Sequence, residues 1–140
     1  MRPKANMKRQ RATIIVEVDQ RILLVENRGG LVLLPGGGIN PEESRLQAAV
    51  RELAEETGLI AESMLFLFSH ESATNCHNVF WAAASGAALA GDDATALHFF
   101  DQDSPLLIAR MSRASRQIID RFLRRPGSRQ RWLQSPQRHL

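Results

Sequence analysis

Three consecutive glycines, Gly36–Gly38, run into the strongest helix signal of the chain, and this pairing constrains the fold more than any other feature. Asn40 is a good N-cap, Pro41 suits the first helical position, and Glu43 can complete a capping box. Gly58 supplies the left-handed residue that commonly follows a helix. The pattern predicts one helix between these ends, preceded by a turn whose backbone can approach a ligand closely.

The rest of the chain alternates between strand and helix patterns. Within the first helix, the residues expected to face a core recur at i, i+4, i+7 and i+11: Leu46, Val50, Leu53 and Thr57. Runs rich in β-branched and apolar residues predict strands at 13–18, 21–26, 31–34, 64–68, 79–83 and 97–100. A second amphipathic helix begins after Pro105, is broken near Ser112 and ends before Pro126. This order predicts an α/β (α+β) fold, a three-layer α/β/α sandwich with a mixed β-sheet.

The charge is segregated along the chain. Residues 1–11 carry five Lys or Arg and no acid, residues 12–109 have a balance of −10, and residues 110–140 have a balance of +8, which together give the net charge of +3. An acidic body between basic ends indicates a metal-binding centre and, less directly, an anionic partner. The length of 140 residues suits one domain. We expect that domain over residues 1–125, with a basic arm at 1–11 and a basic tail at 126–140.

The cysteine and hydropathy patterns indicate the compartment. Cys76 is the single cysteine, which excludes an internal disulfide framework and suits a reducing environment. The apolar run at 12–16 is too short for a signal-peptide core, and the longest charge-free stretch falls short of the roughly 20 residues of a membrane helix. We therefore expect a cytoplasmic protein that does not enter a membrane.

The predicted helix crowds three carboxylates onto one face. Glu52, Glu55 and Glu56 stand at i, i+3 and i+4, where like charges repel by about a few tenths of a kcal/mol per pair. Mg²⁺ reverses that repulsion and commonly bridges protein carboxylates to substrate phosphates. A glycine turn at a helix N-terminus favours the matching anion, so the stretch suits water attack on a pyrophosphate. The alternative is a solvated glutamate-rich face in which Arg51 pairs with Glu55.

The same stretch resembles the Nudix box, Gly-x5-Glu-x7-Arg-Glu-U-x-Glu-Glu-x-Gly-U, in which U is an aliphatic residue. Every specified position is occupied, by Gly37, Glu43, Arg51, Glu52, Leu53, Glu55, Glu56, Gly58 and Leu59. The preceding Leu34-Pro35-Gly36 is also similar to the lead-in that this family shows. The resemblance to the Nudix hydrolase (MutT-like) family covers the box directly and residues 12–123 more loosely.

The resemblance implies a fold, an activity and roles for the box residues. It implies a three-layer α/β/α sandwich that hydrolyses a nucleoside diphosphate linked to another moiety X, using Mg²⁺ or Mn²⁺. The implied metal shell is Glu52, Glu55, Glu56 and the carbonyl of Gly36. Glu52 or a downstream carboxylate would orient or deprotonate the water, and Arg51 completes the implied catalytic set. Gly37, Glu43 and Gly58 would support the loop and helix, and Arg51 is expected to act with Glu43 in holding them together.

Other residues are weaker candidates for the site. Asp93 is favoured over Asp92 and Glu71 as an additional carboxylate of the site. The alternative is that the Asp92-Asp93 pair only makes a surface loop soluble. Phe80 and Trp81 are candidates for stacking on a base, but strand alternation puts them on opposite faces, so at most one would line a pocket.

Partners and substrate remain open at this level. The Arg-rich C-terminal end could contact nucleic acid, although a solvated helix face is the plainer interpretation, and a homodimer is left open. Thr74 and Asn75 stand where the ADP-ribose subgroup usually has a proline, so a nucleoside triphosphate or another nucleotide derivative is favoured. The alternative function is a non-catalytic Nudix-fold module that senses a nucleotide or binds nucleic acid. The intact set of glutamates favours the enzyme.

Overall fold

The computed structural model describes residues 8–91, 94–100 and 105–125. Its elements, in chain order, are β1 (Arg9–Val18), β2 (Arg21–Glu26), β3 (Val32–Leu33), β4 (Gly36–Gly38), α1 (Arg45–Thr57), β5 (Ile60–Glu71), β6 (Asn75–Ser85), β7 (Ala96–Phe100), α2 (Pro105–Arg110) and α3 (Arg113–Leu123). The expected tail at 126–140 and most of the basic arm lie outside the described residues. No helix in the described ranges is long and apolar enough to cross a membrane.

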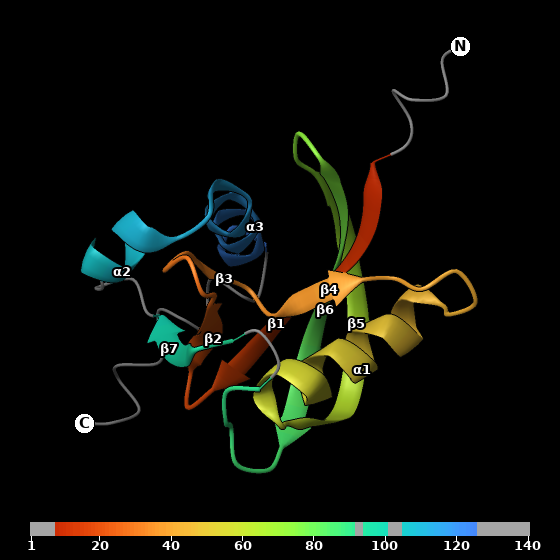
Figure 1. The fold of residues 1–140 in the computed structure, drawn as a ribbon, viewed down its shortest axis with the longest axis horizontal. Helices are drawn as coiled ribbons and strands as arrows, with labels where there is room; N and C mark the ends of the chain where they lie inside the picture. Colours follow the sequence, from red (N-terminus) through yellow and green to blue (C-terminus); the bar gives the residue numbers. More distant parts are fainter. Residues whose placement is uncertain (1–7, 92–93, 101–104, 126–140) are drawn as a thin grey trace.

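The strands form one mixed sheet, as the sequence predicts. The main path runs β3-β2-β1-β6-β5, with β4 added beside β1 and β7 beside β2. β1 pairs with β6 in parallel, and the other strand pairs are antiparallel. α1 covers one face, and α3 covers the other (Figure 1). The α/β/α arrangement is therefore confirmed.

Alternation along β1 divides the core into two clusters. Ile14 and Val16 point to the α1 side, where they pack with Leu53 and Phe80. Ile15 points to the α3 side and packs in the other cluster. All five side chains are buried, and each such burial contributes about 1.5–3 kcal/mol. These contacts hold α1 and α3 against opposite faces of the same strand.

The hairpin turn between β1 and β2 and the break in the second helical region are both well defined, and the break confirms the prediction made for Ser112. Asp19 and Gln20 form the turn between β1 and β2 with φ values of 51° and 66°, the pair of positive values that a type I′ hairpin turn requires. The second helical region breaks at Ser112, whose hydroxyl accepts a hydrogen bond from the Ser115 amide at 3.1 Å and caps α3. The Ser115 hydroxyl in turn accepts from the Leu34 amide at 2.9 Å, which ties α3 to the segment before the glycines.

The predicted start of α1 is wrong. Ser44 is the N-cap, and it makes a reciprocal capping box with Gln47 at 3.0 and 2.8 Å. Asn40 and Glu43 instead close a separate turn through two 3.0 Å hydrogen bonds, with Pro41 inside it. Glu43 lies outside the helix because its carboxylate is bound by an arginine of α1. Gly58 ends the helix with φ 75°, as predicted.

The predicted apolar stripe of α1 is half wrong. Leu53 and Thr57 are fully buried, but Leu46 and Val50 remain 47% and 41% exposed. Ala48 and Ala49 make the buried contacts in the N-terminal half of the helix. Which residues of α1 are buried depends on where the sheet lies beneath the helix. The periodicity of apolar residues alone does not specify that position.

The triple glycine forms a strand where the sequence predicts a turn. β4 pairs antiparallel with residues 11–13 of β1, and Gly36 stands opposite Thr13. Gly36 has φ +152°, and a Cβ at this position would overlap the backbone oxygen of Ala12. The position therefore requires glycine, because the two strands approach so closely. The pairing fixes β4 directly beside α1.

Candidate active site

The glycine strand and the glutamate face of α1 are in direct contact. The Glu52 carboxylate lies on Gly37 so closely that a Cβ at Gly37 would overlap it. The Gly36 amide donates a hydrogen bond to Glu56 Oε1 at 2.9 Å. The two halves of the box are thus one surface, with backbone from β4 on one side and carboxylates from α1 on the other.

Arg51 organises the carboxylates around this surface. It binds both Glu43 oxygens, from Nε at 2.7 Å and from Nη2 at 2.8 Å. Its Nη1 donates to Glu52 Oε2 at 3.0 Å and to Glu55 Oε1 at 3.1 Å, and its Nη2 also donates to the Gly38 carbonyl at 3.1 Å. One guanidinium therefore joins the loop, the strand and the helix.

This network shifts the titration of its members. The bidentate hydrogen bond from Arg51 lowers the pKa of Glu43 to about 2, with help from the Asn40 amide. The same bond, followed by that to Glu52, raises the pKa of Arg51 above its ordinary value. Glu43 and Arg51 therefore stay ionised at neutral pH and serve as fixed charges.

The donor chemistry of the site suits a divalent cation. Within the described residues, Oε1 of Glu52 and Oε2 of Glu55 receive no hydrogen bond, so both are open acceptors. Carboxylate oxygens with room for water are the ligands that Mg²⁺ prefers. However, no three acidic, His or Cys side chains of the described ranges converge on one point. Glu52 and Glu55 each give one oxygen to Arg51, so a cation would be bound through the other oxygen of each carboxylate.

The weaker candidates are placed as follows. Phe80 is only 2% exposed and packs in the cluster beneath α1, with its ring edge-on to Phe66, so it offers no free face to a base. Trp81 lies on the opposite face and donates from Nε1 to Glu17 at 2.9 Å. Glu71 is paired with Lys8 at 2.8 Å. Asp93 lies outside the described residues.

The sequence interpretation missed Arg11. Charge counting assigned it to a basic arm, whereas the structure places it inside β1, opposite Gly38 of the glycine strand. Its partly buried guanidinium donates to Thr13 Oγ1 at 3.2 Å and to the Leu34 carbonyl at 3.4 Å. The available signal was its position next to a β-branched run, which is typical of a strand rather than of a solvated arm.

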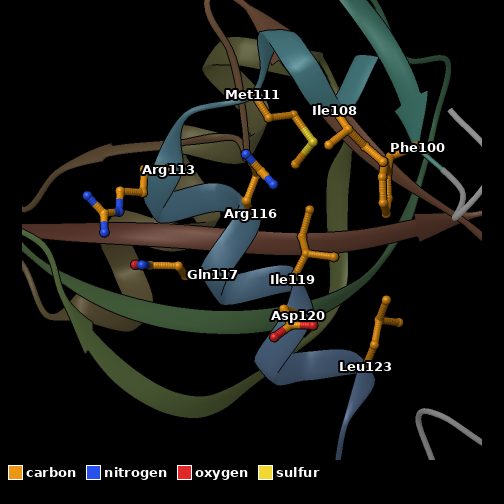
Figure 2. Close-up of a pocket in the computed structure, with 9 residues that line it drawn as sticks. All are labelled: Phe100, Ile108, Met111, Arg113, Arg116, Gln117, Ile119, Asp120 and Leu123. Atoms are coloured by element: carbon orange, nitrogen blue, oxygen red, sulfur yellow. The ribbon is translucent and has the colours of Figure 1, made fainter. Parts of the chain in front are cut away.

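A groove of about 450 Å³ lies elsewhere, along α3 (Figure 2). Its apolar wall includes Phe100, Met111 and Ile119, and its polar wall includes Arg113 and Arg116. It takes no residue from α1 or β4, so it is separate from the carboxylate surface.

The basic C-terminal region is partly neutralised by acidic side chains. Arg110 pairs with Glu26 at 2.6 Å, and Arg124 pairs with Asp120 at 3.0 Å. Arg121 stacks on the Phe68 ring with its Cζ 3.9 Å from the centroid. These contacts agree with the plainer interpretation of this region as an ordinary helix surface.

Comparisons with known proteins agree with this geometry. A family model described as the NUDIX domain matches residues 7–122. The ADP-ribose pyrophosphatase of Methanocaldococcus jannaschii is 36% identical over 98 residues, which cover 62% of this chain and 58% of that protein. The CTP pyrophosphohydrolase of Escherichia coli is 40% identical over 62 residues, covering 41% and 46% of the two chains.

A solved structure assigned to the nudix hydrolase family, from Chromobacterium violaceum, has a TM-score of 0.75 at 30% identity and covers 91% of this chain and 87% of its own. The matches span only about half the length of the two curated relatives, at 58% and 46%. The family model, in contrast, matches most of the chain and includes all nine box positions. This chain therefore belongs to the NUDIX domain family.

Proposed function

We propose that the chain is a Mg²⁺- or Mn²⁺-dependent pyrophosphohydrolase that cleaves the diphosphate of a nucleoside diphosphate linked to another moiety X. The observation that carries this proposal is the contact of the Glu52 carboxylate with Gly37, beside the Glu56–Gly36 hydrogen bond. A side chain at Gly37 would overlap the Glu52 carboxylate, so the bare glycine backbone is what lets this carboxylate lie directly on β4. Membership of a hydrolase family supports the same conclusion.

The hydrogen bonds of the site residues indicate a different role for each of them. Glu52, Glu55, Glu56 and the Gly36 carbonyl are the proposed metal shell. A divalent cation bound there would neutralise phosphate charge and lower the pKa of a coordinated water. Glu52 Oε1 is an open acceptor beside Gly37 and suits the role of receiving the proton of the attacking water. Arg51 holds the other oxygen of the same carboxylate and so orients it.

The substrate class is a nucleoside triphosphate or another nucleotide derivative. The two curated relatives are named for ADP-ribose and for CTP, so both compounds belong in the first panel. That panel also includes the other NTPs, nucleotide sugars, dinucleoside polyphosphates and 5′-triphosphate RNA, each with Mg²⁺, read out as phosphate or nucleotide release. No release from any of them would favour the non-catalytic binding module.

The test of the site is Glu56→Gln. The amide retains an oxygen that can accept the bond from the Gly36 amide, so the variant should fold with an unchanged melting temperature. Loss of the negative charge should remove most Mg²⁺-dependent turnover. Glu62→Gln, on the exposed part of β5, is the matched control and should retain full activity. Wild-type turnover in Glu56→Gln would refute the metal assignment.

A further inference from the structure

Three nitrogen-bearing side chains form a row across the sheet beside the glycine strand. The strand registers place Gly38, Arg11, His77 and His70 side by side on β4, β1, β6 and β5. The rings of His77 and His70 are 6.1 Å apart. The row begins at the strand that carries the Glu52 and Glu56 contacts, so its first cation stands at the edge of the carboxylate surface.

Arg11 is a cation without a matching anion. No carboxylate of the described part of the chain lies within ion-pair distance of its guanidinium, which bonds only to Thr13 Oγ1 and the Leu34 carbonyl. Most of its five N–H donors therefore have no partner among the described residues. Burial lowers its pKa, and the charges of Glu56 and Glu52 act in the opposite direction. An arginine in this state is suited to an oxyanion ligand, which a guanidinium can bind through two hydrogen bonds.

Thr13 and His77 fix the position of Arg11. Thr13 Oγ1 accepts from Arg11 Nε, so its own proton is free to be donated to His77 Nδ1, 2.9 Å away. That arrangement leaves the His77 proton on Nε2. Burial, together with the charges of Arg11 and His70, lowers the pKa of His77 to about 4, so the ring is neutral and adds no competing charge.

The row formed by Arg11, His77 and His70 also contains a buried polar atom that lacks a hydrogen-bond partner among the described residues. His77 is only 7% exposed, and its Nε2 has no hydrogen-bond partner in the described residues. Buried polar atoms without partners are rare in native proteins, because each forfeits the hydrogen bonds that it made with water. A polar ligand or water at this row would remove that penalty. Two independent features, an unmatched cation and an orphaned donor, thus occur side by side.

We propose that Arg11 binds a non-bridging phosphate oxygen of the diphosphate, with Thr13 and His77 as positioning residues for its guanidinium. The inference rests on the proposed function and assigns a substrate contact to it. The carboxylates attract the cations, and Arg11 supplies a fixed positive charge at the edge of the same surface. A diphosphate between them is neutralised from both sides without a further metal ligand.

The experiment is calorimetric binding of Mg²⁺ with imidodiphosphate, a non-hydrolysable diphosphate, to the full chain. Arg11→Met keeps the aliphatic packing and removes the charge, and it should bind on the order of 10- to 100-fold more weakly than wild type. Arg21→Met, at the start of the neighbouring β2, is the matched control and should bind like wild type. Equal affinity of Arg11→Met and Arg21→Met would overturn the assignment. If Arg11→Met does not fold, Arg11→Lys replaces it, because lysine keeps the charge but lacks the planar fork. Wild-type affinity in Arg11→Lys would equally overturn it.

The positioning role has its own readout. Thr13→Val is nearly isosteric but lacks the hydroxyl, so it should weaken imidodiphosphate binding less than Arg11→Met does, and Thr13→Ser should restore the affinity. Equal affinity of the Val and Ser variants would remove Thr13 and His77 from the proposal. Turnover measurements separate the proposed hydrolase activity from the proposed contact of Arg11 with the diphosphate. Diphosphate binding that depends on Arg11, without hydrolysis of any substrate, would refute the enzyme and keep the contact. Hydrolysis unaffected by Arg11→Met would refute only the contact.

Discussion

Gly37→Ala is a direct test of the contact between β4 and α1. A Cβ at Gly37 would stand 2.6 Å from Glu52 Oε1, with the Cδ and Oε2 of the same carboxylate closer still. The carboxylate would have to move by roughly 1 Å to regain ordinary van der Waals contact. A displacement of that size at a reacting group costs about 100-fold in rate, or about 2.7 kcal/mol of transition-state stabilisation. We expect kcat/KM to fall by that order while the chain remains folded.

Gly38→Ala is the matched control for this prediction. Its Cβ would lie 3.3 Å from Arg9 Nη2, the end of a flexible side chain that can move aside. Neither glycine has a positive φ, so alanine strains the folded backbone at neither position, and its effect on the unfolded chain is the same for both variants and cancels in the comparison. The assay is Mg²⁺-dependent release of phosphate or nucleotide on the best substrate, with Mn²⁺ affinity measured in parallel. Equal kcat/KM in the two variants would refute the idea that Glu52 needs a bare Gly37.

Further substitutions test the ion pair at Glu43 and the packing of α1 on the sheet. Because Arg51 holds the pKa of Glu43 at about 2, wild type should exceed Glu43→Gln in stability at neutral pH and lose that advantage as the pH falls from about 4.5 towards 2. Urea unfolding at pH 7 and pH 3 measures the gap, and a gap that does not narrow contradicts the reasoning. Leu53→Ala should lower the free energy of unfolding by about 2–5 kcal/mol, whereas Leu46→Ala, at a 47% exposed position, should change it by less than about 0.5 kcal/mol. Equal losses would show that both leucines support the core.

The box itself could be predicted because its signals are local. Glu52, Glu55 and Glu56 share a helical face by spacing alone, and Gly58 ends the helix by its backbone freedom. The start of the helix could not be predicted, because Glu43 is held outside it by Arg51, eight residues further along the chain. That competition between a capping role and an ion pair is decided by tertiary structure.

The strand role of the glycines and the position of Arg11 have a common cause. Glycine is a poor strand former, so Gly36–Gly38 becomes a strand only because residues 11–13 of β1 pair with it. Arg11 likewise lies between Gly38 and His77 only through that pairing and through β6 on its other side. Neither neighbour is close to β1 in sequence, so no local window contains the information.

The parallel pairing of β1 with β6 also has a kinetic consequence. Ile14 lies beside Phe80, 66 residues away in sequence, and α1 lies within the segment between them. Closing so long a loop is entropically expensive, and topologies dominated by such distant contacts fold slowly. The same closure places His77 beside Arg11. A ligand that binds only the folded site should slow global unfolding of the chain, and hydrogen exchange at the α1 amides should follow the global transition.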